Sequence, residues 1–414
     1  VKCSGCERGY ARTGRFECSK CVDDPVSLFL IALLLGISAV FMIASVILSL
    51  RSATRSRSFL SIYFKVFMNF FQVTMLITNL KLDWPQLYEH LFKLQLNIGE
   101  SSGVSFSVGC FIQDLDSKER FYMNVIAASA LPFTLIFSAT AVWSLIRLVK
   151  QVAFFKYKVI GTLTVLIFLV HSQFTKTMFS IFSCEAVEGS SWISSDLSIK
   201  CWDSQHSFYS LAVALPSIII WVIFLPIFCV SFMYKRRGQL GETSTKYVLG
   251  FLYHGFREGL YYWEFVIFYR KILIIIFAVF LNQYIASQAM FAFLALWAAF
   301  LCQFSKRPFV NKNLNFLEEL SIFASTFTVS CGILFQARIN GDVLQVLLFV
   351  LLLALFSSFI FLIVKEVLLT MLVKLGEKFP ALLKSRGLKI LRKLLCLQTN
   401  PEIKTRVPSL EELV

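Results

Sequence analysis

The chain has 414 residues, of which 57% are hydrophobic and 44 are phenylalanine, and its formal net charge is +15. With a mean hydropathy of +0.71, this composition excludes a soluble globular domain and a disordered chain. Backbone polar groups in lipid must be satisfied within each segment, so the long apolar runs predict an all-α polytopic membrane protein.

The number of membrane spans follows from the apolar runs. A helix needs about 20 apolar residues to cross about 30 Å of hydrocarbon. Nine segments qualify: 27 to 50, 58 to 80, 122 to 148, 157 to 181, 207 to 234, 262 to 281, 284 to 303, 316 to 336 and 341 to 365.

The predicted organisation has four parts. Residues 1–25 form an extracellular Cys-rich membrane-proximal module, and 26–366 form the nine-span helical domain. Residues 367–398 form a basic amphipathic region on the inner leaflet, and 399–414 form a flexible cytosolic tail.

Lysine and arginine collect in alternate loops, at 51–57, 147–158, 235–246 and 306–312, and after residue 365. The positive-inside rule assigns these segments to the cytosol, which places the N-terminus outside and the C-terminus inside. We expect a multi-pass protein of the plasma membrane or a ciliary membrane. The intervening loops 81–121 and 183–206 are acidic; they would attract cations, or they simply reflect the positive-inside bias.

Four cysteines open the chain as two CxxC pairs, Cys3 with Cys6 and Cys18 with Cys21, eleven residues apart. In the cytosol this spacing would indicate a zinc site. Outside the cell it is more typical of disulfides, which persist in oxidising space and staple segments too small for an apolar core. We therefore expect disulfides and no metal, at the membrane-proximal end of a longer ectodomain.

Cys184 and Cys201 lie at the two ends of the short external loop before the fifth span. We predict that they form a disulfide. Cys110, in the preceding external loop, has no evident partner.

Charged residues interrupt the sixth span. Glu264 and Lys271 are seven residues apart, so they share one helix face about 10 Å from each other, whereas Arg270 points elsewhere. An ionisable group at bilayer depth costs at least about 2.5 kcal/mol and requires a partner, a cavity or an interface. Alternatively, this helix is longer and tilted, and its charges lie nearer the inner surface.

Other spans carry charge as well. His171 and Lys176 lie five residues apart in the fourth span, and Lys65 lies near the inner end of the second. Both lysines are placed to extend toward a membrane surface. The candidates for an ion pathway are Glu264, Arg270, Lys271, His171 and Lys176.

The segment after the last span alternates basic and apolar residues. Such a pattern predicts a helix on the anionic inner leaflet of the bilayer, where each basic residue contributes about 1 kcal/mol. A calmodulin-type partner is the alternative. This distribution of positive charge argues against nucleic acid as a partner. The residues proposed to bind the leaflet are Lys384, Arg386, Lys389, Arg392 and Lys393.

Enzyme signatures are absent from the sequence. It has no GxxxxGK[ST], HExxH or GxSxG motif, and its four histidines are scattered. We therefore expect no enzymatic activity and no cofactor.

An ordered series of motifs carries a resemblance. It comprises LDWPQLYEHL, RFYMNVIAASALPF, FSCEAVEGSSWISSDLSIKCW, ALPSIIIWVIFLPIF, GFLYHGFREGLYYWEFVIFYRKILII and KRPFVNKNLNFLEELSIF. The series resembles the TRP-like and polycystin-related membrane proteins of protists, invertebrates and fungi, which carry EGF-like or ephrin-receptor-like Cys-rich repeats outside. The resemblance implies a TRP-like cation channel subunit, with calcium permeability and mechanical gating as candidate properties. The sequence departs from classical TRP channels in lacking a pore loop before the final span, so oligomer assembly is a candidate property that the resemblance does not imply.

Two other functions are compatible with the same residues. One is a membrane anchor or receptor for an extracellular filament or matrix protein, bound through a longer ectodomain. The other is a lipid scramblase-like transporter, in which the charged spans form a polar furrow open to the bilayer.

Overall fold

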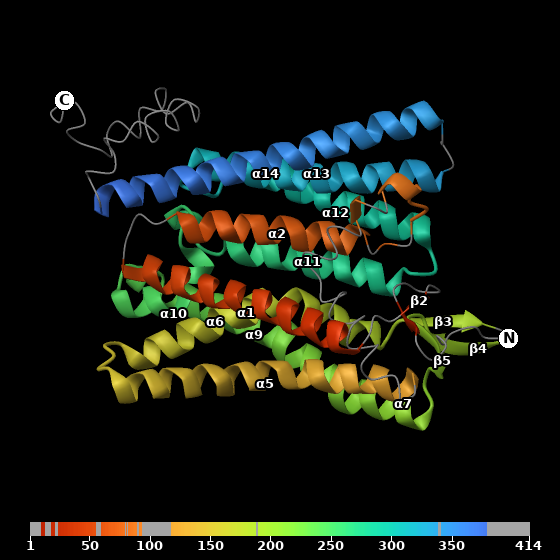
Figure 1. The fold of residues 1–414 in the computed structure, drawn as a ribbon, viewed down its shortest axis with the longest axis horizontal. Helices are drawn as coiled ribbons and strands as arrows, with labels where there is room; N and C mark the ends of the chain where they lie inside the picture. The colour runs from red at the N-terminus through yellow and green to blue at the C-terminus, as the bar shows by residue number, and fades with distance from the viewer. Residues whose placement is uncertain are drawn as a thin grey trace. The chain divides into compact units, whose positions relative to one another are not determined.

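The computed structural model describes residues 10–12, 18–20, 24–54, 59–78, 80, 82–88, 91–92, 117–187, 189–337 and 341–378. These residues are mostly helical (Figure 1). The long helices are α1 (Asp24–Thr54), α2 (Leu60–Thr78), α5 (Ser117–Val149), α6 (Phe155–Ser180), α10 (Thr243–Tyr253), α11 (Trp263–Phe280), α12 (Ile285–Lys306), α13 (Lys312–Gln336) and α14 (Asp342–Lys378).

A further helical run leads from Ser204 to the loop before α10. It comprises α7 (Ser204–Phe208), a π-helical turn (Tyr209–Ala214), α8 (Leu215–Ser217), a second π-helical turn (Ile218–Phe224) and α9 (Leu225–Lys235). Pro216 and Pro226 each lack the backbone N–H that would continue α-helical bonding, and each lies just after a π-turn. The backbone hydrogen bonding changes from π-helical to α-helical near these prolines, and the run remains helical.

Seven helices are long and apolar enough to cross a membrane among the described residues: Leu60–Thr78, Lys118–Val149, Phe155–Ser180, Ser204–Lys235, Ile285–Lys306, Lys312–Gln336 and Asp342–Leu372. Helices α1 and α11 occupy the other two predicted segments. α11 is strongly apolar but carries three charged residues, Glu264, Arg270 and Lys271. The structure thus supports a multi-pass helical protein with seven apolar helices.

The chain divides into two compact units, residues 1–355 and 356–414. In the first unit α2 and α11 lie side by side (Figure 1), and α12 packs against both α11 and α13. Apolar residues of these four helices form one core: Val73, Leu76, Ile77, Ile274, Ile275, Ala289, Ala292, Leu296 and Val329. In the second unit, the described residues are those of α14 from Phe356 to Lys378.

The LDWP motif packs against α13. Trp84 contacts the ring of Phe335 at a centroid distance of 6.4 Å, and the backbone N–H of Asp83 donates to the side-chain oxygen of Gln336. A Cβ at Gly332 would collide with Leu82 and Trp84, so glycine is needed there for the close approach. The motif is therefore a packing element of the fold.

Two short strands, β1 (Tyr10–Arg12) and β2 (Cys18–Lys20), pair antiparallel near the N-terminus. Cys18 starts β2, while Cys3, Cys6, Cys21 and Cys110 lie outside the described residues. The proposed leaflet-binding residues also lie outside them: Lys384, Arg386, Lys389, Arg392 and Lys393.

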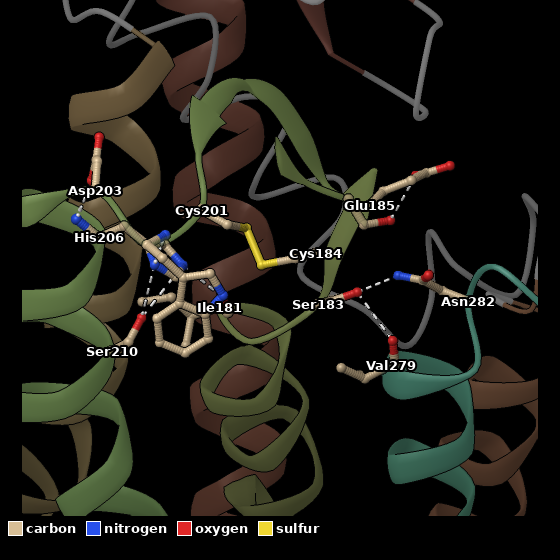
Figure 2. Close-up of a disulfide and its surroundings, with 12 residues drawn as sticks. Ile181, Ser183, Cys184, Glu185, Cys201, Asp203, His206, Ser210, Val279 and Asn282 are labelled. Carbon is tan, nitrogen blue, oxygen red and sulfur yellow. Dashed lines mark hydrogen bonds between the residues drawn. A yellow bond between two sulfur atoms is a disulfide. The ribbon is translucent and has the colours of Figure 1, made fainter. Parts of the chain in front are cut away.

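The loop between α6 and α7 forms a three-stranded antiparallel sheet of β3 (Cys184–Val187), β4 (Ser190–Ile193) and β5 (Asp196–Lys200). The predicted disulfide between Cys184 and Cys201 is confirmed, and it closes a 17-residue separation (Figure 2).

Hydrogen bonds fasten this sheet to the helices beneath it. Ser183 accepts from the Asn282 amide and donates to the carbonyl oxygen of Val279, at 3.0 Å (Figure 2). On the other side, His206 Nε2 lies 2.9 Å from the carbonyl oxygen of Ile181. The sheet is thus a cap joined to both α6 and the end of α11.

Replacing Cys184 with serine should leave Cys201 with a free thiol, because the cap holds its only disulfide partner among the described cysteines. Membrane-impermeant maleimide should then label intact cells that carry the variant. The Cys302→Ser variant, which removes an exposed cysteine outside the cap, is the control. Equal labelling of Cys201 in the unmodified protein, read by peptide mass, would contradict the pairing.

Candidate functional site

The charged residues of α11 face two neighbouring helices. The helix begins at Trp263, and a separate 3₁₀ turn, Glu258–Leu260, precedes it. Arg270 and Lys271 are therefore the eighth and ninth of its 18 residues, in the middle of the helix. All three charged residues are buried, with 6% of Glu264, 8% of Arg270 and 7% of Lys271 exposed.

Glu264 is paired with Lys65 of α2. A distance of 2.7 Å joins Lys65 Nζ to Glu264 Oε2, and Lys65 also donates to the carbonyl oxygen of Phe251 at 3.0 Å. The ammonium group lies 5.1 Å from the centre of the Phe256 ring, within the range of a cation–π contact. The expectation that Lys65 extends to the membrane surface is wrong, because a buried carboxylate and a carbonyl hold it inside the fold.

Lys271 faces the same helix two turns further along. Its ammonium donates to Asn69 Oδ1 at 2.5 Å and to Gln72 Oε1 at 2.6 Å. The Gln72 amide in turn donates to the carbonyl oxygen of Leu169 in α6 at 3.1 Å. Because helix residues seven apart share a face, Glu264 and Lys271 of α11 meet Lys65 and Gln72 of α2 in register.

Arg270 points the other way, to α13. Its guanidinium donates to Glu318 Oε1 at 3.1 Å, and the Glu318 side chain is fully buried. α11 is thus tied to α2 by one ion pair and by the two hydrogen bonds of Lys271, and to α13 by a second ion pair. We call Lys65, Glu264, Arg270, Lys271 and Glu318 the buried charge cluster; three of its members are cationic and two anionic, so one positive charge is in excess.

Some polar atoms around the cluster have no hydrogen-bond partner among the described residues, namely Asn69 Nδ2, Arg270 Nε and Glu318 Oε2. A cavity of about 20 Å³ lies beside Asn69, Gln72, Glu264 and Lys271. A buried water needs at least about 10–15 Å³ and two to four polar partners. The cavity therefore has the size and the lining to hold one water molecule.

His171 lies near the cluster, on α6. Its Nε2 atom faces the carbonyl oxygen of Trp221 at 3.1 Å, so Nε2 must carry a proton to bond there. Its Nδ1 atom lies 3.0 Å from the Thr175 hydroxyl, and its ring lies 4.1 Å from the Phe268 ring. Lys176 is half-buried, about one and a half turns further along α6. His171 thus packs on α11, but its polar contacts are with α6 and the Ile218–Phe224 turn.

Two loops hold the start of α11 in place. Gly255 has a positive φ of 96°, and a Cβ there would collide with Ile62 of α2. The backbone N–H of Val310 donates to the Gly255 carbonyl at 3.0 Å, and Phe256 pairs with Phe309 in an isolated β-bridge. The HGFRE and KRPFVN motifs are therefore bonded to each other next to the starts of α2 and α11.

His254, in the loop after α10, is the first residue of the HGFRE motif. Burial, followed by the charges of Lys65 and Lys246, lowers the pKa of His254 below its ordinary value of 6.5. The imidazole is therefore neutral at pH 7, and it adds no further positive charge beside Lys65.

The sequence identified Glu264, Arg270 and Lys271 but not their partners. Glu318 lies in the predicted span 316–336, and a carboxylate there is as costly as one in α11. Asn69 and Gln72 follow Lys65 at spacings of four and seven residues, which is the helical spacing of one face. The carboxylate in a predicted span could have identified Glu318, and the spacing from Lys65 could have identified Asn69 and Gln72.

Comparison with known proteins gives one relative. Cysteine repeat modular protein A of Toxoplasma gondii is 23% identical over 349 residues, covering 66% of this chain and 11% of the relative. The chain therefore spans about a ninth of that protein's length. No family profile matches the chain, and no solved structure matches it.

Replacing Glu264 with glutamine should lower the free energy of unfolding by about 3–5 kcal/mol, because it leaves the Lys65 ammonium buried without a counter-charge. Lys65→Met should cost a similar amount, and the two together should cost less than the sum. Lys150→Met, at an exposed position, is the control. Thermal unfolding in detergent measures all four variants; additive losses, or losses no larger than the control's, would contradict the pairing.

Proposed function

We propose that this chain is the membrane-embedded part of a larger surface protein. In this role the chain anchors Cys-rich extracellular repeats in the membrane, or acts as their receptor there. The similarity to cysteine repeat modular protein A carries the proposal: a sequence like this one makes up a small fraction of a protein named for cysteine repeats. This chain also carries four cysteines between residues 3 and 21, the residue type for which that relative's repeats are named.

The geometry supports a rigid membrane-embedded part. Two ion pairs and the two hydrogen bonds of Lys271 join α11 to α2 and α13, and the disulfide-closed cap is bonded to α6 and to the end of α11. Force applied to a cap held in this way would pass into several helices at once. Buried polar contacts of defined geometry also fix which helix faces meet.

A TRP-like cation channel is a second candidate. Ionisable residues within membrane helices mark ion and proton pathways by default, and the cavity beside Glu264 and Lys271 has room for one water. The positive excess of the buried charge cluster is unfavourable to a cation at that point. A cation pathway through it would require the ion pairs to separate.

A reporter domain placed before residue 1 tests the anchoring role. The proposal predicts that an impermeant antibody detects the reporter on intact cells, and that alkaline carbonate does not extract it from membranes. A reporter placed after residue 414 is the control and should be detected only in permeabilised cells. An N-terminal reporter hidden until permeabilisation would contradict the proposed role and its orientation.

Reconstitution into liposomes distinguishes the anchoring function from a cation channel and from a lipid transporter. In liposomes the chain should give neither calcium entry nor movement of labelled lipid above protein-free vesicles. Calcium entry that is lost in Glu264→Gln, in a variant that still elutes as a single folded species, would make this protein a channel. Lipid movement alone would make the protein a lipid transporter.

A further inference from the structure

A groove lies between α6, α9 and α10, away from the buried charge cluster. Its volume is about 420 Å³, which is within the usual range for sites that bind small molecules. Most of its lining is apolar and comes from facing sides of three helices: Ile160, Leu163, Ile167, Phe168, Leu225, Phe228, Phe232, Val248 and Leu249.

Most polar residues of the groove gather at one end. Arg236 directly follows α9, Ser244 and Thr245 lie in the first turn of α10, and Tyr157 lies in the first turn of α6. The exception is Thr164, further along α6, whose hydroxyl donates to the carbonyl oxygen of Ile160. From Tyr157 to Phe168 the α6 wall extends eleven residues, about 16 Å at 1.5 Å per residue. The groove therefore has a polar end and a long apolar body.

The polar end is positively charged. Arg236 is exposed, and its guanidinium lies 5.2 Å from the centre of the Phe232 ring, at the border with the apolar wall. The segment 235–246 has four basic residues and one acidic residue, Glu242, whose carboxylate accepts from Ser244 at 3.4 Å. An anionic group is therefore favoured at this end.

The second π-turn shapes the wall formed by α9. The backbone N–H of Leu225 donates to the carbonyl of Ile220, five residues earlier, and Pro226 follows immediately. A π-turn inserts one residue relative to an α-helix, so the side chains after it turn onto a different face. Leu225 and Phe228, just after this turn, line the groove.

We propose that this groove binds one phospholipid with an anionic headgroup, its acyl chain along the apolar wall and its headgroup against Arg236. The charge distribution favours this occupant over the C-terminal segment of the chain, because that segment is itself basic. The positive-inside pattern places the Arg236 end at the cytosolic leaflet, where anionic lipids concentrate. This site goes beyond the proposed anchoring function and does not depend on it.

Native mass spectrometry of the detergent-solubilised chain tests the site, with phosphatidylserine and phosphatidylcholine as probes. One phosphatidylserine should bind in preference to phosphatidylcholine. Arg236→Gln should weaken phosphatidylserine binding about fivefold, from the loss of one basic contact. Arg237→Gln is the matched control, because it removes the same charge from the segment 235–246 at an adjacent residue that does not line the groove, and it should weaken binding less than Arg236→Gln does.

A steric variant tests the acyl chain. Ile160→Trp places a large ring in the groove at a position already 47% exposed, and it should abolish the bound lipid. Ile219→Trp, at a 50% exposed position outside the lining, is its control. Melting temperatures of all four variants should match that of the unmodified chain. Equal weakening by Arg236→Gln and Arg237→Gln, or lipid retained in Ile160→Trp, would overturn the site.

Discussion

The need to neutralise charge inside an apolar helical protein is the constraint on which the rest of the structure depends. An ionised side chain buried in an apolar environment is costly unless it is paired, and α11 carries three such groups. The fold meets this cost by pairing α11 with both α2 and α13, two helices that also pack against each other. The interlocked loops at Gly255 and Phe309 hold the start of α11 beside Ile62 of α2, which keeps the pairs in register.

This arrangement explains why apolar packing alone does not define the helix neighbours. Lipid tails are as apolar as leucine, so contacts between leucine faces discriminate weakly among helix pairs in a membrane. The Lys65–Glu264 and Arg270–Glu318 pairs have direction and a defined position along each helix. We infer that they specify which faces meet, while the apolar residues of α2, α11, α12 and α13 pack together in one core.

The sequence predicted local features well and distant partners poorly. Cys184 and Cys201 were identified because they end one short loop, and Glu264 and Lys271 were placed on one face because helix periodicity fixes their spacing. The partners Lys65 and Glu318 lie 199 and 48 residues away from theirs, and no local rule connects them. Lys65 was misassigned because a lysine near a helix end has two satisfactory environments, the membrane surface and a buried carboxylate. The LDWP and HGFRE motifs pack at close quarters in the fold, as Gly332 and Gly255 show.

A charge exchange between α11 and α13 tests the central claim most directly. Arg270→Glu and Glu318→Arg each place two like charges together in the core, so each alone should lower the melting temperature or prevent folding. Together they restore an ion pair of opposite polarity at the 3.1 Å contact. Recovery of most of the lost stability in the double variant is the predicted result. A double variant no more stable than the worse single variant would show that this pair does not hold α11 to α13.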